Sequence, residues 1–446
     1  MSKTPIVLTI AGTDSGGGAG VSADLKTFAS IGAHGTCAIT SVTSQNTTGV
    51  LGAFNLPPQV VKDQIDAVCI DMDVQWAKSG MLASPEIVST VAECIKKYDL
   101  SLVVDPVMAA EAGGDLLTTD ALSVMRDELL PLCMIVTPNT DEASALSGIV
   151  IETQDDAKRA AKIIADVGVP NIIVTGGHLD ASDVIYESKH DSFTVISGEF
   201  IKGGTHGSGC TYSAALTAYL AHGNSVVNSA RYAKRFVEHA IRESVPIGAG
   251  VAPVNQVAHI RKNAARYEVL DETRRAVEIL TGCKSFVILV PEVGCNIAMA
   301  ITGASDVHDV AAVSGRIAKL KGKAVNVGCV EFGASSHVAR IILAAMQFDN
   351  NIRASVNIKY SLKVLEICKD MNLTISSFDR ADEPEKTSTM DWGVTYAIKE
   401  YGSVPDIISD AGGIGKEPMI RVLGKNALDV ARTAVKIAEK LDENLN

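Results

Sequence analysis

Short apolar segments alternate with amphipathic segments from the start of the chain, and this alternation limits the fold more than any single motif. The apolar segments are rich in β-branched side chains, which is typical of strands buried on both faces. Such an order indicates an α/β domain with a mostly parallel sheet that helices cover on both faces. We predict strands at 6–11, 74–81, 102–107, 134–137 and 172–175, helices at 21–31, 85–98, 155–167, 210–221 and 225–244, and an edge hairpin within 183–200.

The pattern changes near residue 250, where we predict a domain boundary. A glycine-rich segment, 248–253, ends the long helix that precedes it. A charged helix at 263–280 then leads to a new apolar segment at 286–290, which we predict to be a strand. Because 446 residues exceed the size of one ordinary core, we predict two domains, 1–260 and 261–446, the second also of the α/β class.

The composition is that of an acidic globular protein. The net charge of −12 and the pI of about 5.3 argue against a nucleic-acid-binding surface. No apolar run reaches the ~18 residues of a membrane span, and the N-terminus lacks the pattern of a signal peptide. The nine cysteines include no C-x-x-C pair, so neither a disulfide framework nor a cysteine metal cluster is favoured. We therefore expect a cytoplasmic protein that binds small molecules, with no nucleic acid and no membrane as partner.

A glycine-rich turn connects the first predicted strand to the first helix. Its sequence is A-G-T-D-S-G-G-G-A-G over residues 11–20. Glycines at such a turn let a ligand approach the backbone. The motif is not a P-loop, because it lacks G-x-x-x-x-G-K-[ST], and it fits the dinucleotide fingerprint poorly. Taken alone, it is equally compatible with a tight turn that binds nothing.

A second glycine-rich segment, T-H-G-S-G-C at 205–210, opens the helix predicted at 210–221. Backbone N–H groups at a helix start attract anions, so this segment is suited to holding the oxygens of a phosphoryl group. The helix dipole predicts a lowered pKa for the Cys210 thiol, which would let it act as a base toward an alcohol. The alternative is that Cys210 is a small residue packed inward at the helix start.

Further polar residues follow predicted strands, at the edge of the sheet where ligands of α/β proteins gather. Gln45 can donate and accept hydrogen bonds at once, which suits a heterocycle with an amine beside a ring nitrogen. Asp105 ends one strand, and Glu142 follows the next. The pair Gly176 and Gly177 follows the last strand and is a candidate nucleotide contact.

Together these segments resemble the hydroxymethylpyrimidine and hydroxymethylpyrimidine phosphate kinases of the ribokinase-like superfamily. The matching motifs over about residues 4–260 are A-G-T-D-x-x-G-G-A-G, D-L-K-T-F at 24–28, Q-N-T at 45–47, D-P-V-M at 105–108 and T-H-G-S-G-C-T at 205–211. The resemblance implies a three-layer αβα fold. It also implies phosphoryl transfer from Mg²⁺-ATP to 4-amino-5-hydroxymethyl-2-methylpyrimidine and then to its monophosphate. The implied aminopyrimidine contacts are Gly12, Asp24, Gln45, Met81 and Val107.

The same resemblance implies a nucleotide and metal site. Asp105 and Glu142 fall where the superfamily places carboxylates around Mg²⁺-ATP, and Gly207, Gly209 and Cys210 fall at the transferring phosphoryl group. Cys210 stands where sugar kinases have the Asp of G-x-G-D, which disfavours a sugar kinase. Kinases of this branch are commonly dimers, so a homo-oligomer is implied. Pyridoxal kinase is a close relative, and its activity stays open as an alternative.

The second predicted domain carries several candidate anion sites. Arg316 is suited to bidentate phosphate binding. His337 stands at the start of an apolar helix whose small neighbours leave N–H groups exposed. A glycine loop contributes Gly413, Gly415 and Lys416 as a further candidate phosphate cradle. The alternative is that each cation pairs with a nearby carboxylate and that each glycine serves a turn.

This half of the chain resembles the ThiN-type thiamine-phosphate synthase domain. The matching motifs over about residues 270–440 are V-P-E-V-G, V-S-G-R-I, F-G-A-S-S-H-V-A-R, F-D-R, T-M-D-W-G and G-G-I-G-K-E-P. The resemblance implies condensation of the pyrimidine diphosphate with thiazole phosphate, with Arg316 and His337 as the functional pair. The alternative is a kinase with a non-catalytic, thiamine-phosphate-sensing domain. Both residues are present and no helix-turn-helix segment precedes them, which favours catalysis.

Overall fold

The computed structural model describes residues 4–108, 119–177, 179–382, 389–413 and 415–445. The chain divides into two compact units, Met1–Ile260 and Arg261–Asn446, which we call unit 1 and unit 2. Among the described residues, no helix is long and apolar enough to cross a membrane.

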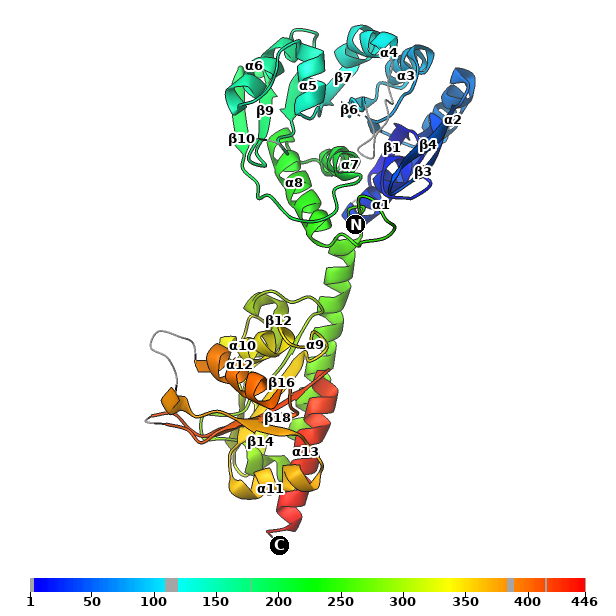
Figure 1. Ribbon diagram of the computed structural model, residues 1–446. Helices are drawn as coiled ribbons and strands as arrows, with labels where there is room; N and C mark the ends of the chain where they lie inside the picture. The colour runs from blue at the N-terminus through cyan, green and yellow to red at the C-terminus, as the bar shows by residue number, and fades with distance from the viewer. Residues whose placement is uncertain (1–3, 109–118, 178, 383–388, 414, 446) are drawn as a thin grey trace. The chain divides into compact units, whose positions relative to one another are not determined.

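Unit 1 is built on an eight-stranded sheet with the order β10-β9-β8-β7-β6-β5-β1-β2 (Figure 1). The strands from β8 to β2 in this order are all parallel, whereas β9 is antiparallel to both of its neighbours. The antiparallel pair forms the predicted hairpin at the sheet edge. The strands are β1 (Ile6–Ala11), β2 (His34–Ile39), β5 (Trp76–Ser79), β6 (Ser101–Val104), β7 (Cys133–Val136), β8 (Asn171–Val174), β9 (Asp183–Glu187) and β10 (Ser192–Ile196).

Helices cover both faces of this sheet. On β6, Leu102 and Val104 pack in the core beneath one helical layer, whereas Val103 packs beneath the other, as the two-residue period of a strand requires. The sheet and the helical layers on its two faces confirm the predicted three-layer αβα fold. One layer contains α2 (Pro58–Asp71), α3 (Pro85–Tyr98), α4 (Thr119–Val124), α5 (Thr140–Ser147) and α6 (Gln154–Ala165), and the other contains α1 (Gly20–Ile31), α7 (Ser208–Ala221) and α8 (Val226–Arg242).

A separate two-stranded sheet projects polar residues next to the glycine-rich turn. Its strands are β3 (Ser41–Asn46) and β4 (Gly49–Asn55), which pair in antiparallel fashion. The Thr13 backbone N–H donates to the Ser41 carbonyl at 2.8 Å, which fixes the turn against this hairpin. Gln45 therefore lies on a hairpin beside the glycine turn.

Unit 2 has a seven-stranded sheet with the order β15-β12-β11-β16-β19-β18-β17. It is antiparallel except for the β17–β18 pair, so its strand arrangement differs from that of unit 1. The strands are β11 (Ile297–Ala300), β12 (Val310–Val313), β15 (Val330–Phe332), β16 (Ala354–Lys359), β17 (Ile375–Ser377), β18 (Ile407–Asp410) and β19 (Met419–Gly424), and a separate hairpin is formed by β13 (Ile317–Leu320) and β14 (Lys323–Asn326).

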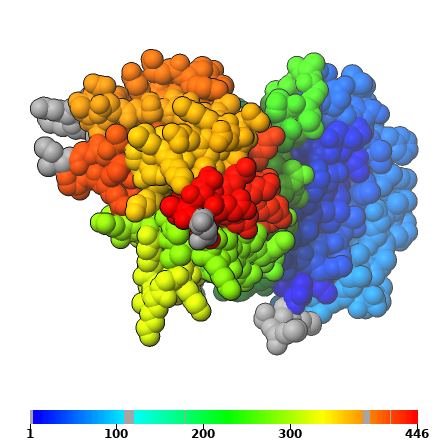
Figure 2. Space-filling model, turned by 90° about the horizontal axis from the view of Figure 1, so that it is seen from below, coloured from blue at the N-terminus to red at the C-terminus, as the bar shows by residue number. Residues whose placement is uncertain are grey.

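The helices of unit 2 also lie on both faces of the sheet. One layer consists of α9 (Ala258–Gly282), α11 (Leu362–Asp370) and α13 (Ala427–Glu443), and the other of α10 (Ser336–Met346) and α12 (Thr389–Tyr401). Figure 2, seen from below, shows the C-terminal end of α13, in red, at the surface. This layering confirms a second α/β domain.

One predicted element of unit 2 is wrong. The apolar run 286–290 is not a strand, because Lys284–Leu289 forms a short 3₁₀ helix. Phe286 and Leu289, three residues apart, are both buried in the core, which is the spacing of a helical turn. A short apolar run satisfies either structure, and its sequence period alone does not separate them.

Candidate functional site

The two glycine-rich loops of unit 1 are packed directly against each other. Gly207 has a φ of +81°, and a Cβ at this position would lie 2.0 Å from the carbonyl oxygen of Gly18. The His206 ring nitrogen Nε2 lies 2.9 Å from the Asp14 carboxylate. The first loop thus supports the second, which opens α7.

Asp14 organises the first loop from within. Its carboxylate accepts hydrogen bonds from the N–H groups of Gly16, Gly18 and Ala19 at 2.8–2.9 Å. Burial opposes ionisation, but these bonds and the bond with His206 together lower the pKa of Asp14. The carboxylate therefore stays charged and holds the two loops in register.

Three of the predicted pyrimidine-binding residues lie around this loop. A Cβ on Gly12 would be 3.1 Å from the Met81 sulfur, so the missing side chain makes room beside Met81. The Ser15 hydroxyl donates to the Gln45 carbonyl at 2.6 Å and accepts from the Gln45 N–H at 2.8 Å. Val107 follows β6 and is half-buried. The structure thus brings Gly12, Met81 and Gln45 to one place.

Asp24 differs from that expectation because it is fully buried and already has partners. Its carboxylate accepts from the Thr9 hydroxyl at 2.6 Å and lies 3.1 Å from the Lys78 ammonium. Lys78 in turn lies 3.7 Å from Oδ2 of Asp105. Sequence reasoning missed Lys78, although a lysine within the apolar strand W-A-K-S is a signal, because a buried charge requires an ionic partner.

Asp105 and Glu142 form the candidate metal site. The Glu142 carboxylate accepts from the Asn139 N–H at 2.9 Å in a capping box that begins α5. Burial, and then the charge of Asp105, raise the pKa of Glu142 to about 8. A cation between two such carboxylates would favour their ionised forms, so the pair fits a divalent cation completed by phosphate oxygens. Among the described residues, no cluster of three or more His, Cys, Asp or Glu side chains could hold a metal ion by itself.

Cys210 is the third residue of α7, where the sequence places it, but its ionisation is not as expected. Burial raises the pKa of the Cys210 thiol to about 12. The predicted lowering is therefore wrong for the protein without substrates, because desolvation, together with the charges of Asp105 and Asp24, outweighs the positive charge of Lys78. The thiol is protonated near neutral pH. A Cβ on the neighbouring Gly209 would meet no atom within 4 Å, which leaves open space at the helix start.

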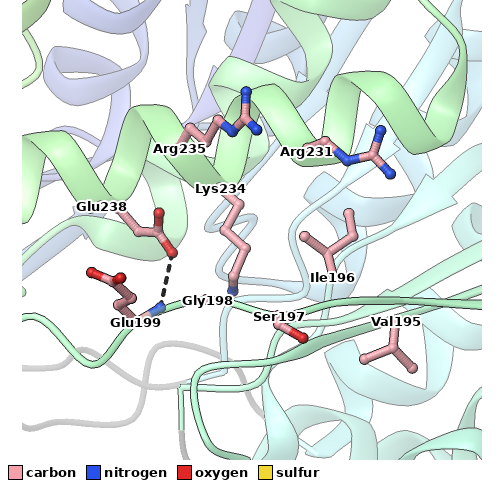
Figure 3. A pocket seen from close by; sticks show the side chains of 9 residues that line it. All are labelled: Val195, Ile196, Ser197, Gly198, Glu199, Arg231, Lys234, Arg235 and Glu238. Atoms are coloured by element: carbon pink, nitrogen blue, oxygen red, sulfur yellow. Dashed lines mark hydrogen bonds between the residues drawn. The ribbon is translucent and has the colours of Figure 1, made fainter.

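A pocket of about 470 Å³ lies between the end of β10 and α8 (Figure 3). Lys234 on α8 pairs with the buried Asp183 carboxylate at 2.9 Å. Asp183 also accepts the N–H of Gly176 at 3.1 Å, which joins this pocket to the predicted nucleotide contact. A Cβ on Gly177 would meet no atom within 4 Å. The pocket is lined by Val195, Ile196, Ser197, Gly198, Glu199, Arg231, Lys234, Arg235 and Glu238.

In unit 2, one carboxylate holds two arginines. Asp410, at the end of β18, accepts from Nε and Nη2 of Arg380 at 2.6 and 3.1 Å and from Nη2 of Arg421 at 2.7 Å. The N–H of Gly412 also donates to Asp410 at 2.9 Å. Burial opposes ionisation, yet the two arginines lower the pKa of Asp410. The cluster carries one negative and two positive charges.

His337 is the second residue of α10 and lies within the field of this cluster. Its side chain retains solvent exposure, but burial against protein atoms, and then the charges of Arg421, Arg380 and Arg316, lower its pKa to about 4. The imidazole is therefore neutral near pH 7, and the site has an excess of positive charge. Such a site is suited to a phosphate or diphosphate.

Arg316 has an unusual backbone conformation. Its φ of +70° is in the left-handed region, which non-glycine residues rarely adopt. The guanidinium donates to the carbonyl of Val293, and the side chain lies beside Gly294. A strained residue that is exposed and interacts with His337 is a candidate for function rather than for stability.

The loop with Gly413, Gly415 and Lys416 follows the same β18 strand. Gly413 and Lys416 exchange backbone hydrogen bonds at 2.9 and 3.0 Å, and Lys416 is exposed. Glu417 then accepts from two N–H groups of the 290–297 segment at 3.0 and 3.1 Å, which ties the loop to the segment that Arg316 also contacts.

Arg421 and Asp410 were not predicted as site residues. Arg421 is fully buried in β19. As with Lys78, the available signal is a charge inside an apolar strand, here M-I-R-V-L-G. Arg380 likewise gains its place only from the parallel β17–β18 pairing, which brings it to the end of β18.

Comparisons with known proteins identify a family for each unit. The model of a family described as phosphomethylpyrimidine kinase matches residues 14–255, and that of a family described as thiamine-phosphate synthase ThiN matches residues 272–436. A bifunctional thiamine biosynthesis protein ThiDN from Methanocaldococcus jannaschii is 35% identical over 443 residues, which covers 99% of this chain and 100% of that protein.

Two further relatives match unit 1. A hydroxymethylpyrimidine/phosphomethylpyrimidine kinase from Streptomyces coelicolor is 42% identical over 253 residues, which covers 56% of this chain and 94% of the relative. The crystal structure of an ADP complex of Bacillus subtilis pyridoxal kinase superimposes with a TM-score of 0.54. The two sequences are 36% identical, and the match covers 58% of this chain and 99% of the kinase chain.

Proposed function

We propose how the two sites act from the premise that this chain belongs to the bifunctional thiamine biosynthesis proteins of the ThiDN type, in which a phosphomethylpyrimidine kinase precedes a ThiN-type thiamine-phosphate synthase. Unit 1, residues 1–260, is the kinase with a ribokinase-like fold, and unit 2, residues 261–446, is the synthase. The observation that carries this assignment is the near full-length match to one bifunctional relative.

In unit 1, Gly12, Gln45 and Met81 hold the aminopyrimidine beside the loop that opens α7. Transfer forms a bond between the hydroxymethyl oxygen and the γ-phosphorus of ATP and breaks the bond to the β,γ-bridging oxygen, with ADP leaving and the hydroxyl proton passing to solvent water. N–H groups of the 207–210 loop stabilise the negative charge on the phosphoryl oxygens. The raised pKa of Cys210 supports a role in shaping this anion hole over a role as base. A second transfer to the monophosphate gives the diphosphate.

ATP is the phosphoryl donor, as the kinase family implies. Asp105 and Glu142 would hold Mg²⁺, which when bound neutralises phosphate charge. The pocket lined by Lys234, whose partner Asp183 holds the Gly176 N–H, offers space for the base of the nucleotide. Lys234 and Asp183 keep the Gly176 turn in place.

In unit 2, Arg316 and Arg380 hold the diphosphate of the pyrimidine, and the buried Arg421 adds positive charge behind them through Asp410. The carbon–oxygen bond to pyrophosphate breaks, and the thiazole nitrogen forms a carbon–nitrogen bond to the same methylene carbon. The arginines stabilise the negative charge that gathers on the leaving pyrophosphate. His337 is neutral and contacts the leaving group or the thiazole phosphate, and the loop with Gly413, Gly415 and Lys416 supplies a further phosphate contact.

Four expectations remain predictions: a cytoplasmic location, a homo-oligomer, dependence on Mg²⁺ and the absence of a nucleic-acid partner. The small-molecule substrates follow from the family, with the aminopyrimidine and thiazole phosphate as the specific pair that we propose.

Substrate choice tests the kinase assignment against a pyridoxal-type kinase. Release of ADP should be at least tenfold faster, as kcat/KM, with the hydroxymethylpyrimidine or its monophosphate than with pyridoxal, because Gln45 matches an amine beside a ring nitrogen. A coupled assay on the full chain measures this directly. A preference for pyridoxal would contradict the assignment.

A further inference from the structure

Lys78 occupies the centre of the kinase site, yet the reaction described above gives it no task. Its side chain has no solvent exposure. It extends from β5 to two carboxylates on different elements: Asp24 on α1, at 3.1 and 3.2 Å, and Asp105 after β6, at 3.7 Å. Three segments of the chain therefore meet at one ammonium group.

Two carboxylates lie within 3.7 Å of the buried ammonium and offset the cost of removing its charge from water. A buried ion pair by itself contributes little net stability, and apolar residues often replace it without loss. Stability is therefore a weak reason for a lysine in this strand.

Both carboxylates have further anchors that fix their orientation. Asp24 accepts from the Thr9 hydroxyl at 2.6 Å, and Asp105 accepts from the Ser213 hydroxyl at 2.8 Å. The contacts of Asp105 with Ser213 and with Lys78 are both made by Oδ2. Oδ2 of Asp105 is thus held by Ser213 and Lys78, and within the described part of the chain Oδ1 is left for a cation or nucleotide.

The site also leaves space for the lysine. Gly80 follows β5, and a Cβ at this position would lie 3.0 Å from Lys78 Nζ and 3.2 Å from the Ala11 side chain. The glycine thus lets the ammonium approach the start of the 11–20 loop. The network consequently extends from the pyrimidine-binding loop to the carboxylate at the nucleotide.

We propose that Lys78 is a positioning residue of the kinase site, which fixes the Asp24 and Asp105 carboxylates relative to each other and so aligns the pyrimidine alcohol with the phosphoryl group. This inference rests on the proposed kinase function. Small errors in alignment are costly in phosphoryl transfer, because catalysis there depends on positioning.

The test compares Lys78→Met, Lys78→Arg and the surface control Lys97→Met, which removes a lysine paired with the exposed side of Asp66. With both substrates saturating, kcat should fall about 100-fold in Lys78→Met and about 10-fold in Lys78→Arg, since arginine keeps the charge but changes the geometry. Lys97→Met should match the unmodified chain. Thermal unfolding of each variant gives the fraction that is folded at the assay temperature, and each measured rate is divided by this fraction.

The proposal would be overturned if folded Lys78→Met had a kcat within twofold of that of the unmodified chain. If Lys78→Met does not fold, an unchanged kcat in Lys78→Arg would overturn it. Calorimetric binding of the hydroxymethylpyrimidine needs no turnover and separates this inference from the function itself. Binding should weaken at least fivefold in the Lys78 variants. Unchanged binding contradicts the role of Lys78, whereas an unmodified chain that binds the pyrimidine without phosphorylating it contradicts the kinase assignment.

Discussion

Gly207→Ala is expected to remove more than 99% of the kinase activity. A loss of about 100-fold or more is typical when an enzyme loses one main hydrogen-bond donor to the developing negative charge. Gly207 has a φ of +81°, and the added Cβ would lie 2.0 Å from the carbonyl oxygen of Gly18. A backbone atom cannot move aside as a flexible side chain can, so the two loops must separate. Separation would shift the N–H groups at the start of α7 away from the transferring phosphoryl group. The measurement is kcat for phosphorylation of the pyrimidine.

Gly223→Ala is the matched control for this prediction. Gly223 has a similar φ of +86°, but a Cβ there would meet no atom within 4 Å. Both variants carry the backbone strain of about 1 kcal/mol that alanine has at positive φ, and only Gly207→Ala adds the clash between loops. Equal kinase rates in the two variants would show that contact between the loops is not required.

Arg316→Ala is expected to lower the rate of thiamine phosphate formation about 100- to 1,000-fold, because one cation that stabilises the leaving pyrophosphate is lost. Arg316 holds a left-handed backbone conformation and is one of three arginines that interact with His337. Kinase activity should not change, since the residue belongs to unit 2. The assay supplies chemically prepared pyrimidine diphosphate with thiazole phosphate and follows the product by mass spectrometry.

Lys319→Ala serves as its control, because it removes an exposed positive charge three residues away, in strand β13 that follows Arg316. If the reaction depended only on general positive charge that attracts the substrates, both variants would slow it at low ionic strength, and their rates would be similar. The account predicts that only Arg316→Ala is slow. Normal condensation in Arg316→Ala would contradict the assignment of the synthase site.

The sequence was sufficient for elements whose apolar period and end signals agree. The helix at 85–98 is correct to the residue, because Ser84 caps its start and Pro85 occupies the first helical position. The run 286–290 lacked such signals, and its 3₁₀ conformation depends on tertiary packing. Capping residues thus predict where a helix begins, whereas local sequence does not decide whether a short apolar run forms a strand or a helix.

The site was predictable where a motif carries its own geometry. The loops at 11–20 and 205–210 are in contact, and Gly12, Gln45 and Met81, which the resemblance assigns to the pyrimidine, come together beside them. By contrast, Lys78 and Arg421 acquire meaning only from partners that are distant in sequence. The ionisation of Cys210 was missed for a related reason: its place at a helix start is visible in the sequence, whereas the desolvation that raises its pKa is not.

The central claim is that one chain carries out both phosphoryl transfers and the condensation. The most direct measurement is a single reaction of the full chain with hydroxymethylpyrimidine, Mg²⁺-ATP and thiazole phosphate, analysed by mass spectrometry. The account predicts thiamine phosphate, with pyrimidine monophosphate and diphosphate as intermediates. Accumulation of pyrimidine diphosphate without thiamine phosphate would contradict it and would make unit 2 a sensing domain attached to a kinase.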